Sequence, residues 1–252
     1  MLKLTFLGTS HGFAEKNRFT SGTLIETENY SYVLDAGAPL EYRLVNLEKS
    51  FDSIRGIFIT HMHNDHVDSL SSLIVSFLGY RRNEQSVCFL PEQNGIDAFL
   101  TWLSAMHCEE DWVRSTVDFR LTKPGVIFDN GDVRVTAVPN LHLFHLLNNP
   151  DADKIAFSYI FEKDGRSVLF TGDMGGGFKE YPEIIGNRHF NLVVCEMAHG
   201  KLSEVQDLLK KTDTDRMLIT HYHMPMIEGY EKIFPEFPFD VQLAVDGMTI
   251  LV

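Results

Sequence analysis

The sequence contains few cysteines, and their spacing excludes two classes of small protein. Cys88, Cys108 and Cys195 are the three thiols, and no two of them form a CxxC pair. An odd number of widely spaced cysteines fits neither a disulfide framework nor a cysteine zinc knuckle. We therefore expect reduced thiols with a structural role.

Long apolar runs are also missing. No segment approaches the roughly 18 to 20 consecutive apolar residues that are needed to cross a bilayer. The first residues, MLKLTFLGTSHG, contain only a short apolar run before a polar turn, and they have no small-residue cleavage site. These absences predict a soluble, cytoplasmic protein with no membrane partner.

Basic residues are outnumbered by acidic ones. The chain has 22 Lys and Arg against 35 Asp and Glu, a formal net charge of -13. Nucleic-acid surfaces gain affinity from clustered basic side chains, so a nucleic-acid partner is disfavoured and a small-molecule substrate is expected. The 252 residues, 44% of them hydrophobic, suffice for a sizeable core, and we expect a single domain over 1–252. The oligomeric state stays open, a homo-oligomer included.

Strand-like and helix-like segments alternate along the chain. Period-two alternation and turn residues predict strands over 2–7, 23–27, 30–34, 53–60, 86–90 and 191–195. Further β-rich runs extend from 117 to 173, with hairpin turns at Asn130-Gly131 and Asp164-Gly165. The strand 216–221 and a hairpin over 241–252 complete the β-rich segments.

Helical spacing of apolar residues predicts the remaining elements. Helices are expected over 39–49, over 67–79 with Gly79 as the C-cap, over a helical section at about 92–114, and near 201–211. The aromatic residues of 92–114 are expected to serve mainly in packing, with lining of a substrate site as the alternative. Together the elements predict a mixed α/β (α+β) domain with two strand-rich halves.

The stretch THMHNDHVD, residues 60–68, is unusually dense in histidine and carboxylate and directly follows an apolar run. His61 and His63 are two apart, so on extended backbone they point to the same side. Asp65 and His66 then fall in the first turn of the following helix. Imidazole and carboxylate are the ligands that zinc, iron and manganese share, so the cluster predicts a site for one metal or for two; a histidine-rich polar loop is the alternative.

Three further candidate ligands stand where other strands end. His142 follows VTAVPNL, Asp173 follows VLFTG, and His221 follows RMLIT. Taken alone, such a histidine is more often a surface residue, and an aspartate in TGD is more often a turn former. Their repeated placement just beyond β-rich runs favours convergence on the same metal site.

This set of residues resembles the metallo-β-lactamase-fold hydrolase superfamily over nearly the whole chain. LGTSHG near the start, VLDAG at 33–37 and VLFTGD match the same family beside HMHNDH. The resemblance implies a four-layer αββα sandwich of two mixed sheets flanked by helices, with two divalent transition-metal ions, zinc first and manganese or iron as alternatives. It implies one metal held by His61, His63 and His142, the other by Asp65, His66 and His221, and Asp173 bridging both.

Several neighbouring residues have open roles. His145 and His223 lie close in sequence to His142 and His221, but the family pattern of Pro, two residues, then His matches PNLH at 139–142. His145, His223 and His11 are candidates to contact substrate or a ligand. Asp35 either fixes the tautomer of a ligand histidine or forms a turn. Asp68 is expected to favour the helix N-terminus through its charge.

The resemblance is greatest to the branch of tRNA 3′-endonucleases and small phosphodiesterases. It implies hydrolysis by hydroxide that a dinuclear metal centre activates, with Asp65 orienting the nucleophile. The tRNA enzymes carry His-Glu-Ala-Thr where this chain has Cys195-Glu196-Met197-Ala198, so His199 becomes the candidate general acid. We predict hydrolysis of a small phosphodiester or cyclic phosphate. A carboxylic ester, lactone or thioester is the main alternative; a tRNA 3′-processing endonuclease and a non-catalytic metal-binding protein are weaker ones.

Overall fold

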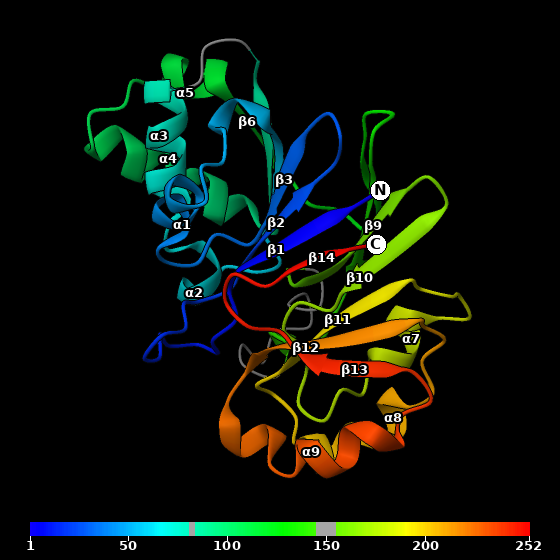
Figure 1. The fold of residues 1–252 in the computed structure, drawn as a ribbon. Helices are drawn as coiled ribbons and strands as arrows, with labels where there is room; N and C mark the ends of the chain where they lie inside the picture. Colours follow the sequence, from blue (N-terminus) through cyan, green and yellow to red (C-terminus); the bar gives the residue numbers. More distant parts are fainter. Residues whose placement is uncertain (81–83, 145–154) are drawn as a thin grey trace.

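The computed structural model describes residues 1–80, 84–144 and 155–252 (Figure 1). Its strands form two seven-stranded sheets, and each sheet is partly antiparallel and partly parallel. The helices lie on the outer faces of the two sheets, so the order of layers is helix, sheet, sheet, helix. This confirms the predicted αββα sandwich of two mixed sheets.

The first sheet has the order β14-β1-β2-β3-β4-β5-β6. Its strands are β1 Lys3–Gly8, β2 Gly22–Glu26, β3 Ser31–Leu34, β4 Ile54–Phe58, β5 Ser86–Leu90, β6 Val117–Leu121 and β14 Thr249–Leu251. Neighbouring strands from β14 to β3 are antiparallel, and those from β3 to β6 are parallel.

The second sheet has the order β13-β12-β11-β10-β9-β8-β7. Its strands are β7 Gly125–Asp129, β8 Arg134–Pro139, β9 Phe157–Lys163, β10 Arg166–Phe170, β11 Leu192–Met197, β12 Arg216–Tyr222 and β13 Asp240–Leu243. The pairs from β7 to β10 are antiparallel, and those from β10 to β13 are parallel. Both sheets therefore present a row of parallel strands whose carboxyl ends share one edge.

Helices cover each sheet from outside. On the first sheet lie α1 Leu40–Asn46, α2 Asn64–Val67, α3 Leu70–Tyr80, α4 Gln93–Ala105 and α5 Glu110–Thr116, with the 3-10 turn η1 Phe51–Ser53. On the second lie α7 Tyr181–Ile185, α8 Leu202–Leu209 and α9 Tyr230–Ile233, with the 3-10 turns η3 Met224–Ile227 and η4 Phe234–Glu236. No helix in the described ranges is long and apolar enough to span a membrane.

The core has three layers because neighbouring side chains on a strand face opposite sides of the sheet. On β10, Val168 and Phe170 belong to the apolar cluster between the sheets, whereas Leu169 packs with the outer helices. On β4, Phe58 faces the other sheet and Ile57 faces α3 and α4. All of these side chains are buried, so the two sheets are held face to face by close packing.

The structure differs from the sequence prediction at the last two strands. The segment 241–252 is not a hairpin, because β13 pairs with β12 in the second sheet and β14 pairs with β1 in the first. The chain crosses between the sheets at Asp246 and Gly247. The Asp246 carboxylate accepts hydrogen bonds from Thr9 and from the Phe19 amide, and Gly247 donates its amide to Phe6. The Met248 amide donates to the Val245 carbonyl, so a local turn is present, but its two arms enter different sheets.

The predicted helix over 67–79 is also different. It is divided into α2 and α3, because the Ser69 amide donates to the Ala36 carbonyl instead of continuing the helical hydrogen bonds. Gly79 is not a C-cap, since α3 continues to Tyr80, whose ring stacks on Phe51 with centroids 5.9 Å apart. The other predicted strands and helices are present with ends shifted by a few residues.

Candidate metal centre

The predicted site residues come together at the shared edge of the two sheets. The HMHNDH stretch follows β4, His142 follows β8, Asp173 follows β10, and His221 is the penultimate residue of β12. Carboxyl ends of parallel strands from β4, β10 and β12 thus face one another across the sandwich, as is general for ligand sites of α/β sheets. The sequence spacing alone could not show this convergence.

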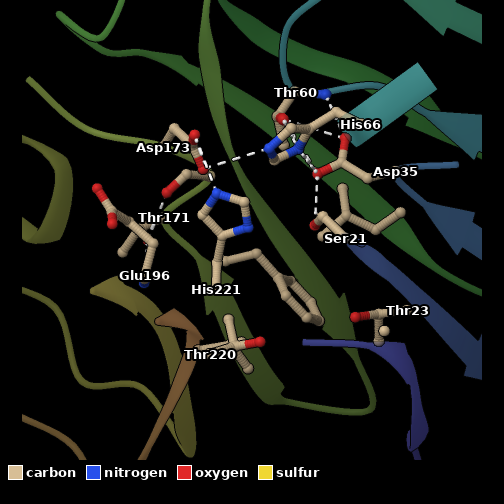
Figure 2. A pocket seen from close by; sticks show the side chains of 15 residues that line it. Ser21, Thr23, Asp35, Thr60, His66, Thr171, Asp173, Glu196, Thr220 and His221 are labelled. Atoms are coloured by element: carbon tan, nitrogen blue, oxygen red, sulfur yellow. Dashed lines mark hydrogen bonds and ion pairs between the residues drawn. The ribbon is translucent and has the colours of Figure 1, made fainter. Parts of the chain in front are cut away.

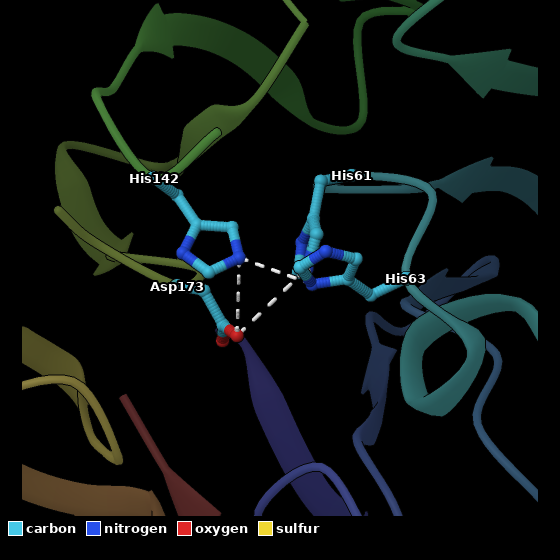
Figure 3. A group of neighbouring side chains, drawn as sticks. All are labelled: His61, His63, His142 and Asp173. Carbon is cyan, nitrogen blue, oxygen red and sulfur yellow. Dashed lines mark hydrogen bonds and ion pairs between the residues drawn. The ribbon is translucent and has the colours of Figure 1, made fainter. Parts of the chain in front are cut away.

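Three histidines form one part of the centre, here called the three-histidine group (Figure 3). The Nδ1 atom of His63 lies 2.9 Å from Nε2 of His61 and 3.1 Å from Nε2 of His142. The Asp173 carboxylate lies 3.8 Å from both of those Nε2 atoms. His61 and His142 are buried, whereas His63 is half-buried and faces the opening.

Asp65, His66 and His221 form the second part, here called the Asp65 group. Oδ2 of Asp65 lies 3.3 Å from Nε2 of His66 and 3.5 Å from Nε2 of His221. Asp173 reaches this group as well, 3.4 Å from His66 and 3.3 Å from His221 (Figure 2). All three side chains of the group are buried. Asp173 therefore stands between two sets of nitrogen and oxygen donors.

The donor set fits metal ions. Among the described residues, Oδ2 of Asp65, Nε2 of His66 and Oδ1 of Asp173 are buried and have no hydrogen-bond partner, an arrangement that costs free energy unless a cation satisfies the atoms. In the three-histidine group, a proton shared by two facing nitrogens leaves the third nitrogen without a partner, whereas a cation accepts lone pairs from all three. Imidazole and carboxylate donors suit divalent transition metals.

Asp35 and Thr60 hold the rings of the centre in place. Nδ1 of His66 donates to Oδ2 of Asp35 at 2.7 Å, and the same carboxylate accepts from the amide of Thr60 at 2.8 Å. Because a carboxylate only accepts, this contact places the proton on Nδ1 and directs the Nε2 lone pair toward Asp65 and Asp173. Of the two roles expected for Asp35, its contacts therefore support the fixing of a histidine tautomer over the forming of a turn.

Unusual backbone conformations aim two of these side chains. Asp35 has φ +57° and His221 has φ +47°, both in the left-handed region that non-glycine residues rarely adopt. At Gly37, an added Cβ would lie 2.2 Å from the carbonyl oxygen of Asp65. The tight approach of the β3 end to the HMHNDH segment therefore requires glycine at position 37.

The electrostatic environments of the two groups differ. Burial lowers the pKa of His61, His63 and His142, and neighbouring rings lower it further, although Asp173 acts in the opposite direction. Burial also disfavours charge on His66, but the carboxylates of Asp173 and Asp35 raise its pKa well above the usual value. A positive charge, whether a proton or a metal ion, is most favoured at the Asp65 group.

His199 lies at the rim of the centre and is held by Glu196. Its Nδ1 lies 3.1 Å from Oε1 of Glu196, and its ring centroid lies 4.6 Å from that of His142. Burial disfavours the charged ring, but the hydrogen bond to Glu196 and the charge of Asp173 raise the pKa of His199 to about 9. Cys195 lies on β11 and is fully buried in the cluster between the second sheet and its outer helices.

Sequence reasoning did not assign a role to Glu196 or Thr60. Glu196 accepts hydrogen bonds from the amides of Met174 and His199, so it joins the Asp173 loop to His199. Glu196 lies near the carboxyl end of β11, as the predicted residues do on their own strands. This position could have identified Glu196 as a site residue. Thr60 directly precedes His61 and is the common neighbour of Asp35, His61 and His66.

The remaining candidates lie around the centre. His221, and not His223, joins the other six predicted ligands, while the His223 ring lies against that of His11, with centroids 4.4 Å apart and planes inclined by 42°. Asp68 is the C-cap of α2 and stands two residues before the first residue of α3, where it lines a groove with Trp102. His145 lies outside the described residues.

Solved structures with the same fold cover nearly the whole chain. The metallo-β-lactamase-fold protein YhfI from Bacillus subtilis is 16% identical, with a TM-score of 0.76 over 100% of both chains. The short form of human tRNase Z is 17% identical, with a TM-score of 0.75 over 99% of both chains. A diphosphatase of the PhnP family has a TM-score of 0.70 at 14% identity, covering 100% of this chain and 98% of that one.

Fold and site together define a protein with the metallo-β-lactamase fold and two groups of candidate metal ligands, which confirms the fold predicted from the sequence. A family model described as anti-Pycsar protein Apyc1 matches residues 2–233. The chain therefore belongs to the anti-Pycsar protein Apyc1 family.

Individual relatives are more distant. Ribonuclease Z of Mycobacterium sp. is 22% identical over 279 residues, which span 98% of this chain and 94% of the relative. Ribonuclease Z of Picosynechococcus sp. is 29% identical over 146 residues, which span 56% of this chain and only 44% of that relative. Both of these relatives are named ribonuclease Z, and at 22% and 29% identity their substrate is not assigned to this chain.

Proposed function

We propose that the protein is a metal-dependent phosphodiesterase that hydrolyses a small phosphodiester or a cyclic phosphate. The observation that carries this proposal is the convergence of two donor groups on the single carboxylate of Asp173. Paired metal sites of this kind serve in-line displacement at phosphorus. The similarity to a diphosphatase of the PhnP family supports the same choice.

The proposed ligands are divided between two ions. The three-histidine group would hold one ion and the Asp65 group the other, with the Asp173 carboxylate available to both. When bound, the ions supply hydroxide near neutral pH and polarise the attacked phosphoryl oxygen. We take zinc as the first candidate for both ions and manganese or iron as alternatives, because these donors suit all three metals.

Asp65 has a second task in this proposal. Its Oδ2 atom is buried and has no hydrogen-bond partner among the described residues, and it faces the interior of the centre. From there it accepts a hydrogen bond from the attacking hydroxide and orients the oxygen toward phosphorus.

His199 supplies the proton for the leaving group. It is a third exposed, whereas the neighbouring ring of His142 is buried, so it is the acid that substrate reaches from the opening. The Glu196 carboxylate fixes Nδ1 and keeps the ring protonated, and Nε2 donates to the departing oxygen.

A second candidate function has its own support. Beside His63 lies a groove lined mainly by apolar side chains of α2 and α4: Met62, Asn64, Val67, Asp68, Ser71, Ala98, Phe99 and Trp102. Trp102 is 57% exposed, so its indole is available to a ligand. Such a groove favours an acyl chain, and it supports the alternative of a carboxylic ester, lactone or thioester substrate.

A substrate panel on the metal-loaded protein separates these functions. The protein is loaded with Zn²⁺ or Mn²⁺ and assayed with bis(p-nitrophenyl) phosphate, a cyclic phosphate, a lactone, a thioester and p-nitrophenyl acetate. The proposal expects the highest kcat/KM for a phosphodiester or cyclic phosphate. The Trp102→Ala variant is expected to have a lower kcat/KM than the wild type only on substrates that carry an apolar group. Faster turnover of the lactone or thioester would assign the alternative. A protein that binds no metal after loading would overturn both.

A further inference from the structure

We propose that His11, Glu15 and His223 form a third metal site, outside the two groups described above. It takes one divalent transition-metal ion through two imidazoles and one carboxylate. One donor atom from each residue lies within 4.8 Å of the other two. The inference rests on this geometry and does not depend on which substrate the main centre hydrolyses.

The backbone brings the two histidines together. Ser10, after β1, forms an isolated parallel bridge with Tyr222, the last residue of β12. The next residue on each strand is a histidine, so the bridge places His11 beside His223. Segments more than 200 residues apart in sequence thus supply two adjacent imidazoles.

The ring pair has the geometry of the rings in the main centre. The centroids of His11 and His223 are 4.4 Å apart and their planes are inclined by 42°. His66 and His221 of the Asp65 group are 4.9 Å apart and inclined by 54°. His11 and His223 therefore approach each other as closely as two rings that are expected to share one cation.

Glu15 is fixed so that one of its oxygens remains available. Its backbone pairs with Arg18 through two hydrogen bonds of 3.1 Å, and its Oε2 accepts from Nη1 of Arg18. Arg18 is itself held by the carbonyls of Thr9 and Tyr222 and lies over the Tyr222 ring. Oε1 of Glu15 faces His11, 3.6 Å from its Nε2. A carboxylate positioned by a second hydrogen-bonded residue is typical of metal ligands.

Partial exposure of the site suits an exchangeable ion. The side chain of His11 is 19% exposed and that of Glu15 is 30% exposed, so solvent reaches both. Two imidazoles and one carboxylate leave positions for water on zinc, iron or manganese. An ion here would tie the connection between β1 and β2 to the end of β12, next to His221.

A metal count on matched variants tests the site. Metal-free protein is brought to equilibrium with Zn²⁺ by dialysis, and zinc and protein are measured on both sides of the membrane. His11→Ala and Glu15→Gln are each expected to bind one zinc fewer per chain than the wild type. His107→Asn, at an exposed histidine of another segment, is the control and is expected to bind as many as the wild type.

A spectroscopic measurement keeps the test independent of the main centre. In Asp173→Ala loaded with Co²⁺, adding His11→Ala is expected to lower the d–d absorption by the contribution of one ion. Equal zinc counts in wild type, His11→Ala and Glu15→Gln, with unchanged circular dichroism, would overturn the third site. If the main centre bound no metal, the difference of one ion would still be measurable, so the two proposals fail separately.

Discussion

The three-histidine group and the Asp65 group lie a few ångströms apart and share Asp173, yet they differ in charge and exposure. The first consists of neutral imidazoles, one of which, His63, is half-buried at the opening. The second is fully buried and contains Asp65, with Asp35 directly behind His66. The pKa of histidine is lowered in the first group and raised at His66 in the second.

This difference predicts two unequal cation sites built from nearly the same side chains. Carboxylates behind and beside His66 attract any positive charge, so we expect the Asp65 group to bind an ion more strongly and to bind protons more readily. The three-histidine group has less negative charge and better access to solvent. We therefore expect tight binding at the Asp65 group and exchange at the three-histidine group.

Removing the carboxylate that both groups share should have the largest effect. Asp173→Ala is expected to lower kcat by about 10³-fold or more, because loss of several kcal/mol of charge stabilisation affects both ions. Metal content and kcat, measured together, check this result. Asp118→Ala, an exposed carboxylate on β6, is the control. Full activity of Asp173→Ala would remove the bridging role.

Weakening only one group should separate the two sites. Asp35→Asn is expected to reduce metal affinity of the Asp65 group by about 10- to 100-fold, the usual range for a residue that orients a ligand histidine. The three-histidine group should keep its ion. Stepwise removal by a chelator, followed by metal analysis, distinguishes one weakened site from two.

The matched control for this variant is Asp132→Asn. Asp132 is also a buried, hydrogen-bonded aspartate, but it lies with Thr27, Tyr32 and Lys163 and contacts none of the site residues. The Asp132→Asn variant should have a lower melting temperature than the wild type, but a chelator should remove its metal ions in the same steps. Equal loss of both ions in Asp35→Asn would contradict the division into two groups.

Acidification should release the two ions in a defined order. The pKa of His66 is raised, so as pH falls a proton competes for His66 earlier than for His61 or His142, whose pKa values are lowered. The Asp65 group should therefore show the steeper loss of affinity with falling pH. Metal titrations of the wild type between pH 8 and pH 5 measure both slopes; a steeper slope at the three-histidine group would reverse the comparison.

The smallest expected effect is at His199, which stands beside His142 and faces His221. With a pKa raised to about 9, its ring is protonated below that pH, so the rate should fall as pH rises through this range. Glu196→Gln removes the hydrogen-bonded carboxylate and lowers this pKa, so the alkaline limb of kcat/KM should move to lower pH. An unmoved limb would exclude His199 as the acid, and Glu204→Gln on exposed α8 is the control.

Much of the fold could be predicted because local patterns agree with the tertiary structure. The Asn130-Gly131 and Asp164-Gly165 turns join β7 to β8 and β9 to β10, and both strand pairs alternate between core layers. The terminal strands were misassigned because their partners, β12 and β1, are distant in sequence. A turn signal at Asp246-Gly247 cannot reveal that its two arms enter different sheets.

The site, like the fold, contains residues that a local sequence pattern indicates and residues that depend on distant strand neighbours. His61, His63, Asp65 and His66 are close in sequence, so their spacing alone indicated a common target. Glu196 and the pairing of His11 with His223 depend on strand neighbours such as the Ser10–Tyr222 bridge, and no local pattern contains that information. The metal-ligand roles, the single domain over 1–252 and the cytoplasmic location stay predictions.

The pairing of β1 with β14 has a consequence for assembly of the first sheet. Thr5 and Thr249, which face each other across this pair, are 244 residues apart. Closing a loop of that length costs about 5 kcal/mol of chain entropy beyond the constant term, more than any adjacent hairpin in the molecule. The mutual hydrogen bonds of Leu2 and Val252 bring the two ends of the chain into contact, as Figure 1 shows. A short peptide joining residue 252 to residue 1 would remove that entropic cost, and a circular permutant opened at the Asn130-Gly131 turn would keep the same strand order.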